Sequence, residues 1–336
     1  MSYQFLTDDA LADGLREIAR QQLRRLERLL RDQDEIATGY HKTRKSIKRL
    51  RALLLLAQPI IGSRSWKRLD RSLREVSRAL SGQRDSTVIR LVLERLASTY
   101  GEAAIGAGGQ RLRQTLMEPV LASRSTAEPS PDIARLRRKV VRIARRIEQL
   151  PLAGLGVAAT LSGMSDAYRA GRAAIRQAYA SHHPEDFHDL RKAVQQHMRH
   201  MQLFAAAWPQ ELQLRIELAR SLSRRLGEDH DLALLRAALR NGHAANTADG
   251  LDRLCQERQL ALRSAARGDL KRLYGERPKA LGRRMAAYWT AAAAVGLGAQ
   301  TVGDASSAAG SPAKVKPSSR QERSSRRAVA PAAAHE

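Results

Sequence analysis

Residues 41–54 read HKTRKSIKRLRALL, and on a helix their polar and apolar side chains separate onto opposite sides. At about 100° per residue, the basic and imidazole side chains share one face. That face holds His41, Arg44, Lys45, Lys48 and Arg51. The opposite face holds Ile47, Leu50, Leu53 and Leu54. The stretch therefore predicts a helix that buries one face in a core and presents cations on the other.

The charge of this helix face is not balanced by acids. Residues 40–80 contain twelve Lys and Arg against two acids, Asp70 and Glu75, whereas residues 1–39 contain six against eight. A solvated face usually alternates Glu with Lys or Arg at i,i+4, because opposite charges stabilise the helix there and like charges oppose it. This face instead places like charges next to one another, which indicates that it binds an anion. The alternative is the plain solvent-exposed face of a basic protein.

Three more predicted helices repeat this division into a basic and an apolar face. Their basic or polar side chains are Arg71, Arg74 and Arg78 around residues 65–80, then His188, Arg191, Lys192, Gln195 and Arg199, and finally Arg220 and Arg224. The apolar side chains that oppose those of residues 188–199 are Leu190, Val194, Met201 and Phe204. His197 falls on the apolar side and is predicted to be a core or interface histidine.

The chain also repeats itself in two ordered blocks. The first block pairs His41, Arg44 and Lys45 with His188, Arg191 and Lys192 at an offset of 147 residues. The second block pairs Arg74, Ser77, Arg78, Leu80 and Asp85 with Arg220, Ser223, Arg224, Leu226 and Asp231 at an offset of 146 residues. The shared order and near-equal offsets predict two related helical halves with a boundary near residue 151.

Apolar residues recur at intervals of three and four residues along the chain, as in amphipathic helices. No sustained alternation of apolar and polar residues, as in strands, appears, so the predicted fold is all-α. The predicted helices lie near residues 8–31, 40–57, 65–80, 85–99, 132–149, 165–180, 185–206, 210–226, 231–240 and 248–273. Glycine and proline favour loops at residues 101–109, 123–131, 151–163 and 241–250.

The predicted architecture is two pseudo-symmetric helical bundles that enclose a basic groove between their cationic faces. Residues 1–150 form the first half, residues 151–295 the second, and residues 296–336 a disordered tail rich in Ala, Ser, Pro and Arg. A groove lined by arginine forks and lysine charges suits a linear polyphosphate anion. Histidine adds charge when it is protonated, and for His41 and His188 a helix-start hydrogen bond is the other role open.

Composition points to a polyanionic partner inside the cell. Lys and Arg outnumber Asp and Glu by 59 to 34, which gives a formal net charge of +25 and a pI near 11.2. The single cysteine, Cys255, excludes an intrachain disulfide framework and a cysteine-based metal cluster. The N-terminus lacks the pattern of a secretory signal. The uncharged residues 285–303 are mostly Ala and Gly, which disfavours a membrane span, so the predicted location is the cytoplasm.

Two other functions compete with polyphosphate binding. A nucleic-acid binder also meets a phosphate array, but only 4% of residues are aromatic, so stacking on single-stranded bases has little support. A metal-dependent phosphohydrolase could use the adjacent His230 and Asp231, but no set of further ligands stands out. Asp85 and Asp231 are predicted to cap or begin helices, and the alternative role is to orient an arginine. We therefore predict no catalytic residue, no metal and no cofactor.

The motifs described above resemble the CHAD family of α-helical domains with histidine-containing motifs. The resemblance rests on His-x-x-Arg-Lys-x-x-Lys-Arg-Leu-Arg at residues 41–51, on its shorter partner from His188, and on GEDHDL at residues 227–232. It spans about residues 5–290. It implies two pseudo-symmetric bundles around a basic cavity that binds inorganic polyphosphate, in some members on polyphosphate granules. The binding positions it implies are His41, Arg44, Lys45, Lys48, Arg51, His188, Arg191 and Lys192.

The second half departs from the family pattern at two positions. Gln195 stands where the pattern has Lys, and Met198 stands where it has Arg, so we expect a weaker site there. Some relatives carry an alternating-glutamate triphosphate-tunnel signature, which this sequence lacks. The predicted function is therefore non-catalytic binding of polyphosphate, with a granule-associated or scaffolding role. Arg74, Arg78, Arg199, Arg220 and Arg224 extend the predicted binding set.

Overall fold

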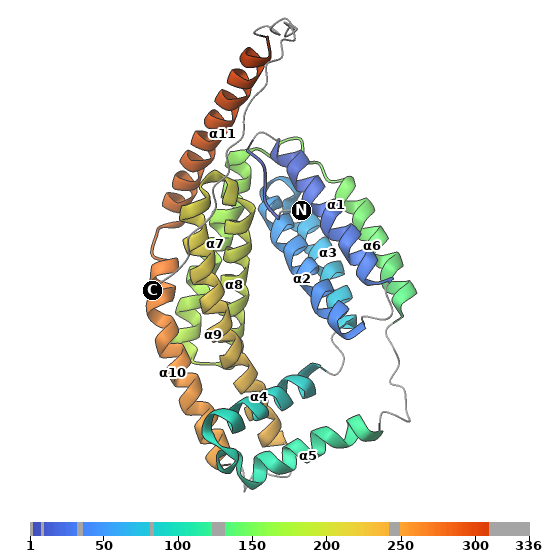
Figure 1. The fold of residues 1–336 in the computed structure, drawn as a ribbon, viewed down its shortest axis with the longest axis vertical. Coiled ribbons are helices and arrows are strands. Elements are labelled where there is room, and N and C mark those ends of the chain that lie inside the picture. Colours follow the sequence, from blue (N-terminus) through green and yellow to red (C-terminus); the bar gives the residue numbers. More distant parts are fainter. Residues whose placement is uncertain are drawn as a thin grey trace, which may run out of the picture. The chain divides into compact units, whose positions relative to one another are not determined.

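The computed structural model of the chain describes residues 3–7, 10–31, 36–80, 84–122, 132–241 and 249–308. Within these ranges the regular structure consists of helices and contains no strand (Figure 1). The predicted all-α class is therefore confirmed. Among the described residues, no helix is long and apolar enough to cross a membrane.

The helices follow one another with short connections. Those before residue 150 are α1 (Leu11–Leu29), α2 (Ile36–Leu56), α3 (Gln58–Ala79), α4 (Arg84–Tyr100), the 3₁₀ turn η2 (Glu102–Ile105), α5 (Gly106–Ala122) and α6 (Ile133–Glu148). Those after it are α7 (Val157–Ser181), α8 (Pro184–Leu203), the 3₁₀ turn η3 (Ala205–Ala207), α9 (Pro209–Asn241), α10 (Asp249–Leu273) and α11 (Pro278–Ala308).

Most predicted helices are present, but three predictions about breaks are wrong. Residues 157–163, placed in the predicted loop 151–163, form the start of helix α7. The expected interruption between residues 226 and 231 is absent, because α9 continues from Pro209 to Asn241. Asp231 therefore lies inside a helix and cannot cap one. Residues 106–109, predicted to be a loop, begin helix α5.

The C-terminal region differs in part from the expected tail. Helix α11 extends to Ala308, past residue 296 where the sequence places the start of the tail. The predicted tail residues 309–336 lie outside the described residues. Residues 1–296 form one compact unit, and residues 297–336 are assigned to a second.

The helices of the first unit pack in two groups. Helices α1, α2, α3 and α6 contact one another in a ring, while α7, α8, α9 and α10 pack successively along the chain. Helix α2 contacts α7 and α8, so the two groups meet there. One apolar core runs through both groups, and the apolar faces predicted for α2 and α8 are buried in it. Whether the halves are symmetry-related remains a prediction.

A second apolar core lies away from the first. It joins Leu93 and Leu96 of α4 to Leu235 of α9 and to Leu251 and Cys255 of α10. Helices α4 and α5 precede residue 150 in the chain, yet they contact α9 and α10. The N-terminal part of the sequence therefore contributes to both groups of helices.

Candidate functional site

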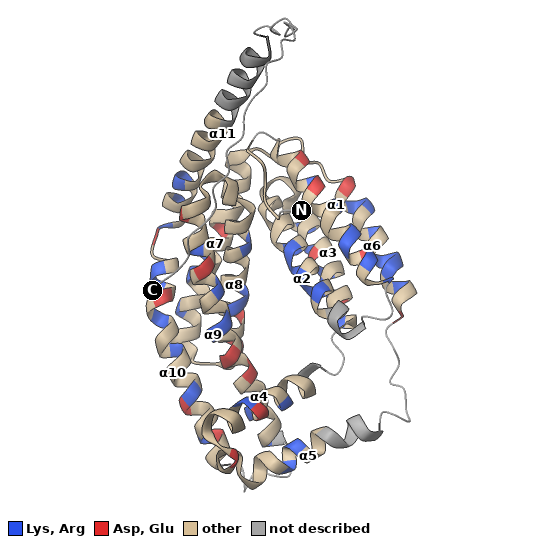
Figure 2. Cartoon of the chain, viewed as in Figure 1, with Lys and Arg blue, Asp and Glu red and all other residues tan. Residues whose placement is uncertain are grey.

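A basic pocket of about 250 Å³ lies where α2, α3 and α8 meet. Seven basic or imidazole side chains line it: Arg44, Lys48, Arg51, His188, Arg191, Lys192 and Arg199. Its other lining residues are Ile47, Ser77, Gln195 and Gln196. No acidic residue is among the described residues that line it. Figure 2 shows Lys and Arg on α2 and on α8, the two helices that supply most of the lining.

The structure brings together side chains that lie some 140 residues apart in the chain. The seven basic or imidazole lining residues were all predicted as binding positions. The other six predicted positions, which do not line the pocket, are His41, Lys45, Arg74, Arg78, Arg220 and Arg224, and all six are exposed. The lining is therefore taken mainly from α2 and α8, and Ser77 is the contribution of α3.

A buried carboxylate orients two of the predicted arginines. Asp70 on α3 is only 4% exposed, and its two oxygens each lie 2.5 Å from an arginine nitrogen, Nε of Arg51 and Nη2 of Arg74. Such charge-assisted contacts fix a guanidinium in place. Sequence reasoning counted Asp70 among the acids but missed this role, although its i,i+4 spacing from Arg74 was a usable signal.

Arg191 lies against a glycine of α9. A Cβ atom added to Gly227 would stand 3.0 Å from Nη2 and 3.2 Å from Cζ of Arg191. The missing side chain therefore gives the guanidinium its place beside the pocket. The sequence motif GEDHDL contains this glycine, but its contact with Arg191 depends on the packing of α8 against α9, which the sequence does not show.

Arg199 is a largely buried cation with further positive charges beside it. Its Nη1 donates to the carbonyl oxygen of Gln195 at 2.8 Å. Burial is the main cause that lowers the pKa of Arg199 to about 10; Tyr3 opposes the shift, and the charges of Arg49 and Arg51 add to it. A depressed arginine pKa marks a place where a positive charge lacks compensation. An anion bound there would remove part of that cost.

Further cations lie beside the pocket. Partial burial lowers the pKa of Lys45, and so do the positive charges of Arg49, Arg25, Arg199 and Arg220, in that order. Lys45 and Arg220 come from the two predicted halves and were both predicted as binding positions. They are outside the pocket lining, but they contribute to the same positive field.

His188 and His230 form a stacked pair at the α8–α9 contact. Their ring centroids are 4.0 Å apart with an interplanar angle of 25°. Burial, followed by the charges of His230, Lys192 and Arg191, lowers the pKa of His188 to about 4. Burial also lowers the pKa of His230. Both imidazoles are therefore neutral near pH 7, and Nδ1 of His188 has no hydrogen-bond partner among the described residues.

Two other histidines, His197 and His200, are buried and contribute to the packing of the helices. His200 Nε2 lies 3.1 Å from the carbonyl oxygen of Ala52, which ties α8 to α2 directly behind the pocket. His197 is 3% exposed and packs against the rings of both Tyr168 and Tyr274. The prediction that His197 is a core histidine is confirmed.

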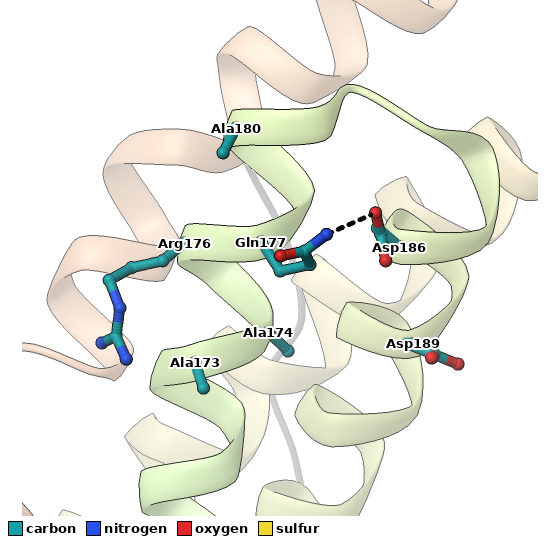
Figure 3. A pocket seen from close by; sticks show the side chains of 7 residues that line it. All are labelled: Ala173, Ala174, Arg176, Gln177, Ala180, Asp186 and Asp189. Carbon is teal, nitrogen blue, oxygen red and sulfur yellow. Dashed lines mark hydrogen bonds between the residues drawn. The ribbon is translucent and has the colours of Figure 1, made fainter.

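A larger pocket of about 510 Å³ lies between α7 and α8 and has a different character. Among the described residues that line it, Arg176 is the only basic one, and the carboxylates of Asp186 and Asp189 accompany it (Figure 3). Gln177 Nε2 donates to Asp186 at 3.2 Å. None of the predicted binding residues lines it. Its mixed charge disfavours a polyanion, so the smaller basic pocket is the candidate site.

The His230–Asp231 pair has no metal-binding surroundings in the part of the chain that is described. There, no group of three or more His, Cys, Asp or Glu side chains is placed to hold a metal ion. His230 instead stacks on His188.

Comparisons with known proteins support the fold and the family. The solved structure of PptA from Streptomyces chartreusis matches with a TM-score of 0.57 and 18% sequence identity, over 80% of this chain and 100% of that chain. At this identity the likeness concerns the fold. None of the curated proteins is similar enough to match. The model of the CHAD domain matches residues 14–240, more than half of the sequence. The chain therefore belongs to the CHAD domain family, which is associated with polyphosphate binding.

Proposed function

We propose that this protein binds inorganic polyphosphate, without turning it over, in the basic pocket between α2, α3 and α8. The observation that carries the proposal is the lining of that pocket, where seven basic or imidazole side chains meet and no described lining residue is acidic. Membership of the CHAD domain family supports the same ligand.

The ligand class follows from charge density and geometry. Arginine presents a planar fork of donors that matches phosphate oxygens, and lysine adds a mobile point charge. Asp70 holds Arg51 and Gly227 leaves room for Arg191, so these groups are positioned before the ligand arrives. Preorganised donors lose less side-chain entropy on binding than free ones do. A linear phosphate chain also relieves the repulsion among the cations.

The absence of turnover is part of the proposal. Hydrolysis of a phosphoanhydride needs an activated water and groups that stabilise the leaving oxygen. The pocket supplies cations but no general base among its described lining residues other than His188, whose pKa of about 4 makes it a weak one. We expect no release of orthophosphate from polyphosphate, with or without added Mg²⁺ or Mn²⁺. A cytoplasmic role on polyphosphate granules, as a granule-associated or scaffolding factor, fits such a binder.

The test compares two double variants of equal charge change. Arg44→Gln with Lys48→Gln removes two cations from the pocket lining, while Arg326→Gln with Arg327→Gln removes two from the C-terminal segment. Each lost charge-assisted hydrogen bond costs about 1.5–3 kcal/mol, so we expect the pocket variant to bind short polyphosphate about a hundredfold more weakly or worse. The C-terminal variant should keep most of its affinity. Calorimetric titration, with circular dichroism to verify helicity, measures both.

The salt dependence gives the same test a second readout. Counterions released from the phosphate chain should make affinity fall steeply with salt, and the pocket variant should show the shallower slope. Equal losses from the two double variants would show that the protein is a diffuse polycation without a specific pocket.

A further inference from the structure

A second basic surface lies on the outside of the first group of helices. It is formed by Arg64, Arg68 and Arg71 of α3 with Arg138, Arg142 and Arg145 of α6, and we name it the α3–α6 face. All six arginines are exposed. Open depressions of about 450 Å³ on α3 and 520 Å³ on α6 mark this face, and neither depression is lined by an acid among the described residues.

The two arginine rows belong to one surface. Helices α3 and α6 pack side by side (Figure 1), and Lys139 of α6 forms an ion pair with Glu75 of α3 at their contact. That pair neutralises Glu75, and Glu148 at the end of α6 is occupied by Arg20 of α1. The six arginines of the face form no ion pair within the described part of the chain. Their charge is therefore available to an outside partner.

The shape of the face separates it from the basic pocket. The pocket residues belong to α2 and α8 apart from Ser77, and none of the six arginines lines it. Packed helices lie about 8–10 Å apart, so the face presents two roughly parallel rows of guanidinium groups rather than an enclosed groove. In each row the first and last arginine are seven residues apart, about 10 Å along the helix axis.

Such a pair of rows fits a rigid double strand better than a single flexible chain. A duplex carries two phosphate backbones on either side of a groove about 12 Å wide, which two rows at this separation can contact together. A flexible polyphosphate loses chain entropy wherever it binds, and an enclosed pocket offsets that loss better than an open face because more cations contact each phosphate. The six side chains contain no aromatic ring, so the face lacks the ring platforms on which unpaired bases usually stack.

We propose that the α3–α6 face is a docking surface for double-stranded nucleic acid, held through its phosphates without reading of the bases. Arginine contacts to phosphates position a protein on a duplex but carry no sequence information. The protein would then hold two polyanions at separate places, polyphosphate in the pocket and a duplex on the α3–α6 face. The inference goes beyond the proposed function and can fail independently of it.

The experiment measures binding of a labelled DNA duplex of mixed sequence by fluorescence anisotropy across a range of salt concentrations. Arg138→Gln with Arg142→Gln is the face variant, and Arg64→Gln with Arg68→Gln repeats the test on the other row. Each double variant should weaken duplex binding at least tenfold at low salt. Each should also reduce the slope of log affinity against log salt by about 2, one for each phosphate contact removed.

Three comparisons make the outcome decisive. Arg253→Gln with Lys271→Gln removes two exposed cations of α10 and should leave duplex binding within about twofold of the parent. The pocket variant, Arg44→Gln with Lys48→Gln, should also keep duplex binding, while the face variants keep their affinity for short polyphosphate. A single strand of the same length should bind more weakly than the duplex.

Several results would overturn the proposal. Equal losses from the face and α10 variants would show that duplex attraction is spread over the whole surface. Loss of duplex binding in the pocket variant would place the duplex in the pocket instead. If the single strand bound more tightly than the duplex, a duplex would be the wrong ligand class for this face. In each case polyphosphate binding by the pocket remains a separate measurement.

Discussion

His188 shows how a single residue can couple charge in the pocket to pH. It lines the pocket and stacks on His230, so two imidazoles share one partly buried space. Burial, His230, Lys192 and Arg191 all lower the pKa of His188, to about 4, and Asp189 alone raises it. Burial and then Arg191 lower the pKa of His230, while Asp231, Glu185 and Asp229 raise it. The carboxylates therefore act mainly on His230.

We predict that polyphosphate binding takes up protons through His188. The bound phosphates reverse the local field, so the pKa of His188 rises in the complex above its free value of about 4. Because the complex holds the proton more tightly, affinity strengthens as pH falls through the bound-state pKa and stops strengthening below about 4. If the bound-state pKa reaches the ordinary value near 6.5, the gain approaches tenfold per pH unit between these limits.

Calorimetric titration in two buffers of different ionisation enthalpy at pH about 5.5 counts the protons taken up. His188→Gln should abolish most of this uptake while binding at pH about 8 persists through arginine and lysine. The matched control is His183→Gln, at an exposed position before the same helix. A His188→Gln protein with an unchanged pH profile would leave His188 as a packing residue.

At the scale of the helices, periodicity predicted most elements because their apolar stripes are regular. The ends of α2, α6 and α10 follow the predicted limits within four residues. The sequence could not show that α9 is continuous, because a glycine followed by acids usually signals a helix end. Gly227 instead serves packing: it is buried inside α9 and gives Arg191 its space. Helix α5 was missed because its glycine-rich start, GAGG, is typical of a loop.

The same limit applies to the site. Sequence reasoning identified the basic faces of α2 and α8, and those faces line the pocket. It missed the positions of Asp70 and Gly227, since their contacts join different helices. It also missed Tyr3, whose hydroxyl donates to the carbonyl oxygen of Arg49 at 2.8 Å while the Arg49 guanidinium lies 5.0 Å from the Tyr3 ring centre. Contacts of this kind depend on packing that local periodicity does not encode.

Gly227→Ala tests whether α9 positions Arg191. Alanine is about 1 kcal/mol better than glycine in a helix interior, so helix propensity alone predicts a more stable protein. The new Cβ would stand 3.0 Å from Nη2 of Arg191, however, and would push the guanidinium away. We expect a melting temperature at or above that of the parent, together with polyphosphate affinity reduced about as much as by Arg191→Gln.

Gly268→Ala is the matched control, because a Cβ at this position of α10 would meet no atom within 4 Å. It should raise stability by up to about 1 kcal/mol and leave affinity unchanged. Unchanged affinity in Gly227→Ala would show that Arg191 reaches the ligand without this glycine.

At the scale of the whole molecule, the two apolar cores stabilise different sets of helices. The larger core supports α2 and α8, and thereby the pocket. The smaller core joins α4 to the C-terminal part of α9 and to α10. A division of the chain into halves near residue 151, predicted from the repeat, would separate α4 from its packing partners. The order of segments along the chain therefore differs from the order in which they pack.

A destabilising substitution in one core should leave the stability of the other core unchanged. Two leucines of α9 provide the test. Leu235 is fully buried in the smaller core, whereas Leu214 is 67% exposed. Burial predicts that Leu235→Ala costs about 2–5 kcal/mol through lost packing and a residual cavity, and that Leu214→Ala costs almost nothing. Hydrogen exchange should show faster opening of α4 in Leu235→Ala while the amides of α2 keep their protection. Polyphosphate affinity should stay unchanged in both variants, because the pocket is built on the larger core. If α2 loses protection to the same extent as α4, the two cores unfold as one cooperative unit. A destabilising substitution in either core would then also destabilise the helices that form the pocket.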